Sequence, residues 1–356
     1  MKRGKTFLSL FAVVLGAFIL VVTGCGTDSS KTISVFNWGE YIDEDLLTEF
    51  EQETGIHVNY STAPTAEEMY AKIKGGGVKY DIVIPCDYMI ARMIEEGMLE
   101  KIDFANIPNY KYIDSELKNL EYDPDNQYSI PYQWGTVGII YNKNIVDEND
   151  TGSWDLLWNA KYSDQILMFD NVRDAMGIAL KRLGASYNTT DEKILNQAAD
   201  MLIEQKPMVQ AYVMDQIFDK MESGEAAIAP YYTGDYFLML KEIEDSSIDL
   251  GYYTPSEGSN FYVDTMCIPK GAVNKAGAEK FMDFLLRPEN MARNTQVVSY
   301  SSPEKAAREL LPDEMKNNEY MYPDAATLNA NFEIYTNLPE NIRKLYDELW
   351  VKIMTS

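Results

Sequence analysis

Apolar and polar positions beyond Thr32 follow two alternating patterns, one with the spacing of a buried strand and one with the spacing of an amphipathic helix. Short runs rich in β-branched and aromatic residues predict strands, and each is followed by a stretch with helical spacing. In chain order, the first predicted elements are strand 33–38, helix 43–54, strand 57–61, helix 65–74, strand 80–85 and helix 87–96.

Residues at the ends of these helices support the predicted boundaries. Gly55 and Gly97 follow the first and third helices, and glycine readily adopts the left-handed conformation that ends a helix. Thr65 and Glu68 have the spacing of a capping box, in which side chains satisfy backbone N–H groups that the first turn leaves free.

A second series begins near Val137. Its predicted elements are strand 137–141, strand 166–169, helix 174–183, helix 198–204 and strand 226–231, followed by strand 261–268, helix 276–286 and helix 341–353. We expect strand 261–268 and helix 276–286 to return to the part of the molecule formed by the first series. The last helix is expected to complete the second part.

Alternation of strand and helix predicts an α/β fold in which each lobe is a mainly parallel sheet flanked by helices. About 330 residues follow the N-terminal leader, more than one hydrophobic core usually covers, so two lobes are expected. We predict a first lobe of 32–136 plus 263–301 and a second of 137–262 plus 302–356. Because the chain crosses between them more than once, the crossings should form a multi-strand hinge.

The N-terminus has the layout of an export signal. A basic stretch precedes an apolar run over 6–22, and the sequence Val-Thr-Gly-Cys follows at 22–25. This pattern predicts a lipoprotein signal peptide over 1–24, a lipid on Cys25 and a tether over 25–31. An uncleaved membrane anchor is the alternative, although the run is shorter than the ~20 residues that usually span a bilayer. The protein is therefore expected to be lipid-anchored in the cell membrane, outside the cytoplasm.

The charge of the chain limits its partners. Its net charge is −25, and removal of 1–24, which holds three basic residues and no acidic one, makes it −28. Nucleic acid is thus a poor partner, whereas cationic solutes are attracted. Cys86 and Cys267 could form a disulfide or remain buried thiols. With His57 as the only histidine and no CxxC pair, we predict neither a metal site nor a cofactor.

Aromatic residues and carboxylates recur together where strands end, the position at which parallel sheets bind ligands. Aromatic faces attract cations, and carboxylates form charge-assisted hydrogen bonds with ammonium groups. The predicted ligand is therefore an organic cation. The loops concerned are 37–41, 85–88, 170–174, 231–235 and 262–264.

At these residues the chain resembles the spermidine/putrescine-binding proteins of bacterial polyamine ABC importers, which have the type II periplasmic-binding-protein fold. The similarity covers nearly the whole chain after Cys25. It rests on the sequences FNWGEY at 36–41, YDIVIP at 80–85, YSIPYQWG at 128–135, ALKRLG at 179–184 and FLLRP at 284–288.

The resemblance implies a polyamine bound between the lobes, delivery to a membrane ABC permease and a monomeric protein. In that binding mode Asp174 and Asp264 hold ammonium groups, while Trp38, Tyr232 and Tyr262 enclose the methylene chain. A further contact is expected near Phe332 or Glu333. The complete set of implied contacts is Trp38, Glu40, Tyr41, Cys86, Tyr88, Asn171, Asp174, Tyr232, Tyr262, Asp264, Tyr300 and Glu333.

Four positions depart from the family pattern. Members often have an acid at Asn171, tryptophan at Tyr232 and Tyr262, and serine at Cys86. Since chain length is discriminated by the placement of charges and walls, these differences leave the choice between spermidine and putrescine open.

Three other interpretations compete with this one. A carbohydrate-active enzyme also uses paired carboxylates and aromatic platforms, but the chain has none of the motifs GxGxxG, GxxxxGK[ST], HExxH or GxSxG, and His57 is expected to be a half-buried strand residue. A ferric-iron receptor of the same fold is suggested by Tyr231 and Tyr232, although strand alternation predicts that their rings face opposite sides. An adhesive lipoprotein would bind no small cation.

Overall fold

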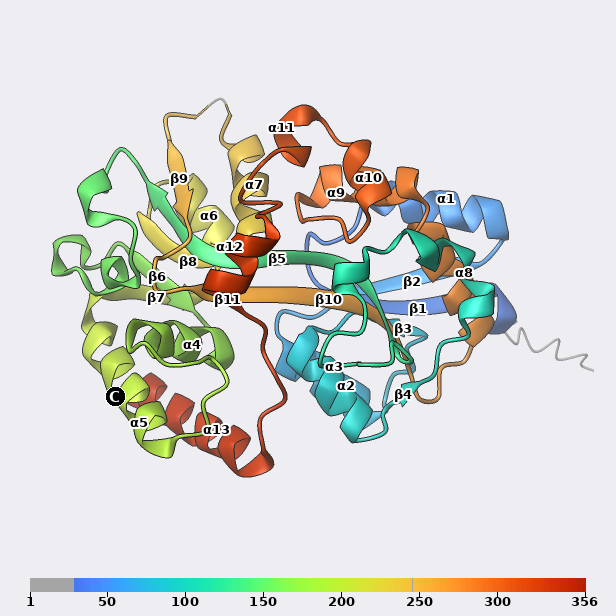
Figure 1. Cartoon of the computed structure of the whole chain (residues 1–356), viewed down its shortest axis with the longest axis horizontal. Helices are drawn as coiled ribbons and strands as arrows, with labels where there is room; N and C mark the ends of the chain where they lie inside the picture. The colour runs from blue at the N-terminus through green and yellow to red at the C-terminus, as the bar shows by residue number, and fades with distance from the viewer. Residues whose placement is uncertain (1–28, 245) are drawn as a thin grey trace, which may run out of the picture.

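The computed structural model describes residues 29–244 and 246–356. The predicted signal peptide and Cys25 lie outside the described residues. Figure 1 shows two lobes side by side, with two long strands running through both. Within the described ranges, no helix is both long enough and apolar enough to cross a membrane.

The first lobe is built on three parallel strands. Strand β1 pairs with β2 on one side and with β3 on the other, both in parallel register. The elements are β1 (Thr32–Asn37), β2 (His57–Thr62), β3 (Ile82–Val83) and β4 (Leu99–Glu100), with helices α1 (Glu44–Thr54), α2 (Ala66–Gly75), α3 (Asp87–Glu95) and α8 (Lys275–Leu285).

The second lobe repeats the arrangement. Strand β6 pairs in parallel with β7 and β8, and β9 adds an antiparallel neighbour to β5. Helix α13 packs on α5 and α4, as predicted for the final helix. The elements are β6 (Ile166–Phe169), β7 (Val209–Val213), β8 (Ile228–Tyr232) and β9 (Leu250–Tyr253), with α4 (Val172–Arg182), α5 (Glu192–Gln205), α6 (Ile217–Glu222), α7 (Thr233–Glu242) and α13 (Glu340–Thr355).

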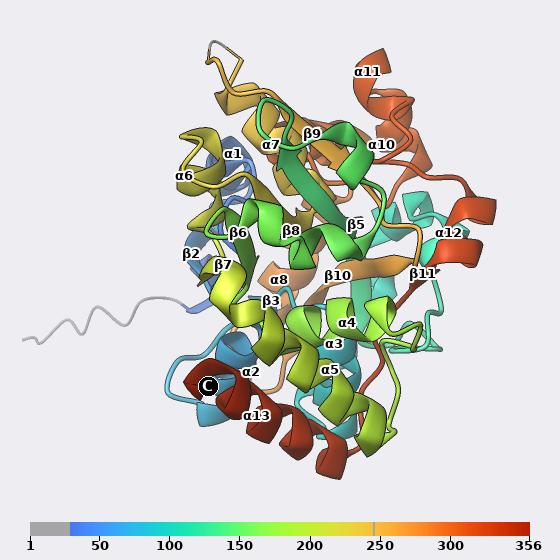
Figure 2. The same cartoon turned by 90° about the vertical axis from the view of Figure 1, so that its left-hand side faces the viewer.

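Strands β5 (Ser129–Asn142) and β10 (Ser259–Pro269) join the two lobes. They are antiparallel, and their pairing runs from Phe261 opposite Thr136 to Cys267 opposite Ser129. Toward the second lobe β5 pairs with β8, and toward the first lobe β10 pairs with β3. The view in Figure 2, along the crossing strands, shows helices on both sides of the sheets.

The segment after α8 packs along the junction. Helix α9 contacts both α8 of the first lobe and α7 of the second. The remaining α-helices are α9 (Pro288–Val298), α10 (Lys305–Glu309), α11 (Asp313–Lys316) and α12 (Ala325–Asn331), and the remaining strand is the short β11 (Phe332–Glu333).

Local sequence determines where the helices begin and end. Gly55 has φ of 68°, and its N–H reaches the carbonyl of Glu51, so the predicted glycine end of α1 is confirmed. The Thr65 hydroxyl accepts from the N–H of Glu68 at 3.2 Å, which confirms the predicted start of α2. Strand β6 has the predicted bounds, 166–169.

Two predicted strands differ most from those observed. The run 80–85 forms only the two-residue strand β3, although the backbone N–H groups of Asp81 and Ile84 also donate to carbonyls of β1. The Asp81 carboxylate accepts backbone N–H groups of Ser34, Val273 and Asn274. Strand β5 begins eight residues before Val137. Its first half contains Pro131 and Gln133, which obscured the strand pattern although both are buried in the sheet.

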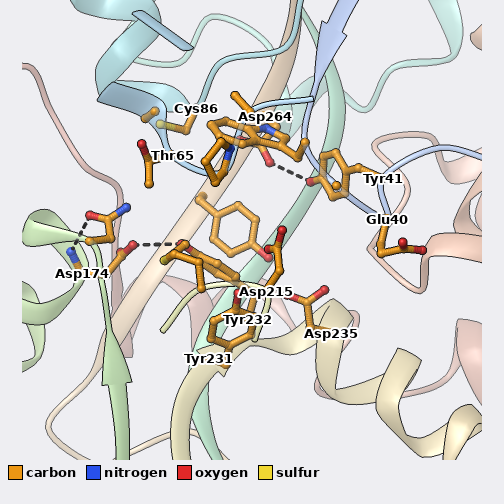
Figure 3. A pocket seen from close by; sticks show the side chains of 18 of the residues that line it. Glu40, Tyr41, Thr65, Cys86, Asp174, Asp215, Tyr231, Tyr232, Asp235 and Asp264 are labelled. Carbon is orange, nitrogen blue, oxygen red and sulfur yellow. Dashed lines mark hydrogen bonds between the residues drawn. The ribbon is translucent and has the colours of Figure 1, made fainter. Parts of the chain in front are cut away.

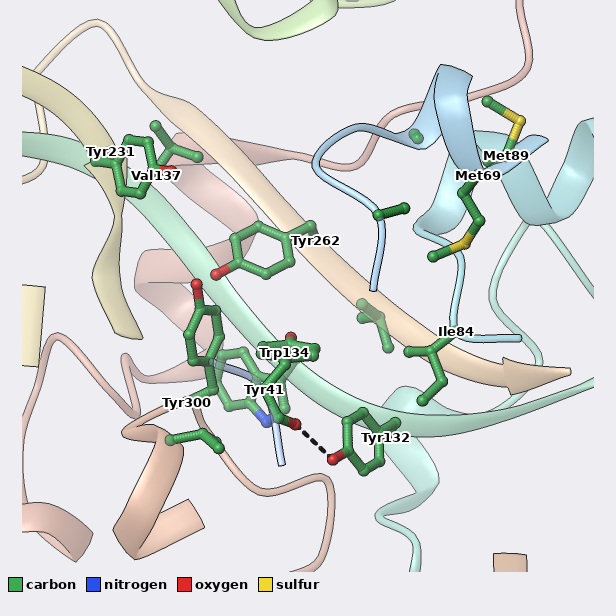
Figure 4. Close-up of a cluster of buried hydrophobic side chains, with 14 of the residues drawn as sticks. Tyr41, Met69, Ile84, Met89, Tyr132, Trp134, Val137, Tyr231, Tyr262 and Tyr300 are labelled. Carbon is green, nitrogen blue, oxygen red and sulfur yellow. Dashed lines mark hydrogen bonds between the residues drawn. The ribbon is translucent and has the colours of Figure 1, made fainter. Parts of the chain in front are cut away.

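Tyrosines dominate the core near the crossing strands. The Tyr132 hydroxyl donates to the carbonyl of Tyr41 at 2.6 Å, which ties β5 to the loop after β1 (Figure 4). Close packing of rings requires glycines: a Cβ at Gly135 would stand 2.5 Å from the Tyr262 hydroxyl oxygen. The positions of these tyrosine rings are therefore determined by the strand register and by the glycines that leave room for them.

Gly177 of α4 offers a test of this packing. A Cβ there would stand 2.4 Å from the ring of Tyr187 and 2.6 Å from the hydroxyl oxygen of Tyr335. We expect Gly177→Ala to lower the free energy of unfolding by about 1–3 kcal/mol through overpacking. Denaturant unfolding measures this, with Gly75→Ala as control, because no heavy atom lies within 4 Å of a Cβ at Gly75. Equal stability of the two variants would contradict the close packing described for α4.

Candidate functional site

A cavity lies between the lobes at the carboxyl ends of their parallel strands. The loops that follow β1, β2 and β3 face the loops that follow β6, β7 and β8 across it. Including the open space at its mouth, the cavity measures about 860 Å³. It thus has the position that the strand-end rule predicts.

All of the implied contact residues except Glu333 line this cavity. They come from both lobes and from the crossing strand β10. They are Trp38, Glu40, Tyr41, Cys86, Tyr88, Asn171, Asp174, Tyr232, Tyr262, Asp264 and Tyr300. Lining residues that the sequence did not single out as contacts include Thr65, Asp87, Asp215, Phe218, Tyr231, Asp235, Asn260 and Tyr335.

Glu333 does not line the cavity. Its carboxylate forms an ion pair with Lys181 and accepts a hydrogen bond from the Ser186 hydroxyl at 2.5 Å. The expectation that Glu333 contacts the ligand is therefore not supported by its position, because its charge is already engaged within the second lobe.

Asp264 projects into the cavity from β10. The register of β10 on β5 shifts between Asp264 and Thr265, and such a bulge re-aims the neighbouring side chains. The Tyr41 hydroxyl donates to the carboxylate of Asp264 at 2.7 Å (Figure 3). Asp264 is only 6% exposed, so its charge is held by this one hydrogen bond and the cavity.

Asp174 occupies the opposite side, on the first turn of α4. It accepts from the hydroxyl of Tyr232 at 2.9 Å and from that of Tyr335 at 3.2 Å. The helix cap is Asn171, whose side chain accepts from the N–H groups of Arg173 and Asp174. Because the Asn171 amide caps the helix, the Asp174 carboxylate is not needed as the cap and faces the cavity.

Aromatic rings line the space between these carboxylates. The centroids of Tyr232 and Tyr262 are 5.3 Å apart at 75°, and those of Tyr41 and Tyr300 are 4.6 Å apart at 90°. Tyr231 and Tyr232 both line the cavity, with centroids 4.9 Å apart. The prediction that these two rings face opposite sides is wrong, because Tyr232 is the last residue of β8 and caps α7, where strand alternation ends.

Three acids form a second acidic group: Glu40, Asp215 and Asp235. Asp235 lies on the first turn of α7, and Asp215 lies in the loop between β7 and α6. Gly39 brings the lobes close here, because a Cβ at this position would stand 3.3 Å from Asp215 Oδ2. Glu40 has φ of 47°, a left-handed conformation that is uncommon outside glycine. Asp215 was missed because the strand preceding it was not predicted.

Several polar groups facing the cavity lack partners. Within the described part of the chain, Trp38 Nε1, the Tyr262 hydroxyl and one carboxylate oxygen of Asp87 form no hydrogen bond, and all three atoms are buried. Buried polar atoms are normally paired. These atoms are therefore candidates for ligand contacts.

The cavity is strongly acidic. Six carboxylates line it, and no lysine or arginine does among the described residues. Burial, opposed by the Tyr41 hydrogen bond and reinforced by Asp174, raises the pKa of Asp264 to about 7. Burial likewise raises the pKa of Asp174 to about 6 and that of Asp235 to about 7, the latter with help from Asp215 and Glu40. The cavity is electrostatically complementary to a cation that would replace the lost water.

Other chemistry has less support. Cys86 and Cys267 form no disulfide within the described residues, and burial raises the pKa of the Cys86 thiol, so it is a poor nucleophile. His57 is exposed rather than half-buried, and its Nδ1 lies 2.7 Å from the Glu51 carboxylate. No group of His, Cys, Asp and Glu side chains suited to a metal ion occurs within 29–244 and 246–356.

Comparison with known proteins identifies the family. Residues 45–323 match the profile described as bacterial extracellular solute-binding protein. The chain belongs to this family. The match spans both lobes and most of the cavity lining, so the two-lobed fold expected from the sequence is confirmed.

Several relatives of this solute-binding protein carry descriptive names. The spermidine/putrescine-binding periplasmic protein of Escherichia coli K12 is 36% identical over 95% of this chain and 96% of its own. A Listeria monocytogenes structure described as a spermidine/putrescine ABC transporter is 42% identical, with a TM-score of 0.87 over 91% of this chain and 99% of that one. The TpPotD lipoprotein of Treponema pallidum is 28% identical, with a TM-score of 0.79 over 90% of this chain and 99% of that one. The resemblance to polyamine-binding proteins is thus confirmed.

The raised pKa values predict an unusual pH dependence of stability. Unfolded aspartates titrate near 4, whereas Asp174 titrates at about 6 and Asp235 and Asp264 at about 7 in the folded protein. Between these values the folded state binds more protons, so raising the pH destabilises it. We expect the melting temperature of the ligand-free protein to fall by several degrees between pH 5 and pH 8.

Calorimetry of Asp264→Asn checks the origin of this effect. The variant carries no charge at this position, so its melting temperature should fall less between pH 5 and pH 8 than that of the wild type. Asp125→Asn, which changes an exposed aspartate, should show the same fall as the wild type. The explanation fails if all three proteins have the same dependence on pH.

Proposed function

We propose that this protein captures a polyamine, spermidine or putrescine, in the interlobe cavity and delivers it to a membrane ABC permease. The observation that carries the proposal is the cavity with six carboxylates, aromatic walls and no basic lining residue among those described. The names of the relatives support the same ligand class. The proposal assigns binding rather than catalysis to the site, in keeping with a family of solute-binding proteins.

The acids lie in two groups that suit a ligand with separated charges. Asp264 interacts electrostatically with Asp174 and Asp87, whereas Asp235 interacts with Asp215 and Glu40. Trp38, Tyr232 and Tyr262 lie in the lining with them and can pack on a methylene chain. Each group would hold an ammonium end, and the proposed contacts are Trp38, Glu40, Tyr41, Cys86, Tyr88, Asn171, Asp174, Tyr232, Tyr262, Asp264, Tyr300, Asp87, Asp215 and Asp235.

The free energy required is within reach of these contacts. Micromolar affinity corresponds to about 8 kcal/mol. Cation–π contacts in desolvated sites contribute about 2 kcal/mol or more, and charge-assisted hydrogen bonds about 1.5–3 kcal/mol each. These gains must exceed the cost of desolvating and ordering a flexible, hydrated ligand. Several contacts of each kind are therefore needed, as the cavity provides.

Closure of the lobes completes the proposed mechanism. We take 32–136 plus 263–301 and 137–262 plus 302–356 as the moving bodies, connected through β5, β10 and the chain after α9. Tyr41 comes from the first body, whereas Asp174 and Tyr232 come from the second, so a ligand that contacts all three favours the closed state. The permease would recognise that closed state.

The remaining parts of the proposal concern location. We propose that Cys25 carries the lipid, that the protein is a monomer anchored at the cell membrane and that its folded part lies outside the cytoplasm. A lipoprotein among the relatives supports the anchor. Tyr231 and Tyr232 both line the cavity, which favours the ferric-iron alternative, so the binding experiment includes ferric citrate.

Asp264→Asn tests the proposed site. The substitution keeps the shape but removes one ammonium partner, so we expect at least about a tenfold loss of affinity for spermidine and putrescine. Isothermal titration calorimetry at pH 8 measures it. Since the pKa of Asp264 is raised by burial to about 7, wild-type affinity should already weaken near pH 6, rather than only near pH 4 as ordinary carboxylates would suggest.

Matched measurements separate the alternatives. Asp125→Asn should retain wild-type affinity, since Asp125 is exposed outside the cavity. Maltose and ferric citrate are expected to give no heat of binding with any of these proteins. Tight ferric citrate binding with a visible absorption band, or polyamine binding that is equal in Asp264→Asn and wild type, would argue against the proposed site.

Labelling tests the lipid anchor. When cells are grown with radioactive palmitate, we expect the wild-type chain to incorporate label and Cys25→Ser to incorporate none. Cys86→Ser should be labelled like the wild type, because Cys86 lies in the interlobe cavity. Label on Cys25→Ser, or no label on the wild type, would exclude Cys25 as the lipidated residue.

A further inference from the structure

The described chain starts at a fixed point on the first lobe. The side-chain amide of Asn274, which caps α8, donates to the carbonyls of Ser30 at 3.1 Å and Thr32 at 3.0 Å. These bonds hold the segment before β1 against the start of α8. The starts of β1 and β2 lie at the end of the molecule farthest from the second lobe (Figure 1).

Lysines gather around this point. Lys79 Nζ lies 3.3 Å from where a Cβ of Gly271 would stand, and the backbone N–H of Lys270 donates to the carbonyl of Met98. We call this surface the lysine face, and it comprises Lys31, Lys79, Lys101, Lys270 and Lys275 with Val78 and Val273.

The charges of the lysine face are mostly uncompensated. Within the part of the chain that the structure describes, Lys31, Lys79, Lys101 and Lys270 form no ion pair, whereas Lys275 pairs with Glu279 at 3.4 Å.

Two of the nearby carboxylates are engaged in other contacts. Asp81 is buried and accepts three backbone N–H groups, and Glu279 is buried and also accepts from the N–H of Asp103. Glu100, partly buried beside Lys101, is the nearest acid in sequence. In a chain with 31 basic and 56 acidic residues, such a concentration of cations opposes the overall charge.

Two valines lie within the lysine face. Val78 and Val273 are both 57% exposed, and their loops are tied together by Asp81. A surface with apolar side chains surrounded by lysines matches the interface of an anionic bilayer, where basic residues bind headgroups and apolar ones enter the boundary.

The position of the lipid anchor limits what this face can meet. Cys25 precedes Ser30 by five residues, so the lipid lies within about 18 Å of Ser30 even for a fully extended chain. We infer that the lysine face rests on the anionic phospholipid headgroups of the membrane that holds the lipid. This inference rests on the anchor at Cys25 in the proposed function, but not on polyamine binding.

A fluorescent probe at Val273 tests the contact. The lipid-bearing protein with Val273→Cys is labelled with an environment-sensitive fluorophore, because the exposed thiol reacts before the partly buried Cys86 and the buried Cys267. It is then placed in vesicles of phosphatidylglycerol and phosphatidylcholine, or of phosphatidylcholine alone. We expect a blue shift with the anionic vesicles that high salt reverses. Leu310→Cys is the control, since Leu310 is 52% exposed and lies outside the lysine face.

Charge reversal identifies the residues responsible. Lys79→Glu with Lys270→Glu should reduce the salt-sensitive shift to about a tenth or less. Lys111→Glu with Lys193→Glu, which changes the net charge equally at exposed sites elsewhere, should leave it intact. No shift with anionic vesicles, or the same shift with neutral ones, overturns the inference.

Calorimetry with spermidine on the same samples separates the two proposals. A protein that binds polyamine but shows no shift overturns the membrane contact alone. A protein that shows the shift but binds no polyamine overturns the proposed ligand alone. Absence of lipid on Cys25, detected by mass spectrometry, overturns the anchor and the membrane contact together.

Discussion

Burial of carboxylates between the lobes is the constraint on which the rest of the site depends. Asp174, Asp235 and Asp264 are each at least nine-tenths buried, and no lysine or arginine lines the cavity within the described residues. Tyrosine hydroxyls supply part of the lost hydration, as Tyr41 does for Asp264. The fold therefore sacrifices stability in the empty state to hold negative charge where a cation can recover it.

The sequence allowed much of this architecture to be predicted, for local reasons. Glycine after α1 and the threonine cap of α2 are signals confined to a few residues, so their positions were correct. The start of β5 was predicted too late, because Pro131 and Gln133 break the strand pattern, and only neighbouring strands show that they are buried. The start of β5 is determined by tertiary contacts, which the periodicity of the sequence does not reveal.

The same distinction applies to the site. Acids and rings that directly follow recognisable strands, such as Trp38 and Asp174, were placed correctly at the cavity. Asp215 follows β7, whose half-buried residues gave no clear signal. Glu333 lies outside the cavity lining, and its pairing with Lys181, 152 residues away in the chain, could not be seen in local sequence. The relative orientation of the Tyr231 and Tyr232 rings depends on the residue at which β8 ends and α7 begins. The spacing of apolar residues does not specify that residue.

The raised pKa values, caused by burial at Asp235 and Asp264, make ligand capture an exchange of ions. Near neutral pH these groups are partly protonated in the empty protein, so an entering diamine displaces protons into solution as it binds. The loaded protein then differs in net charge from the empty one by less than the charge of its cargo. Its measured enthalpy of association must also include the ionisation heat of whichever buffer takes up the displaced protons.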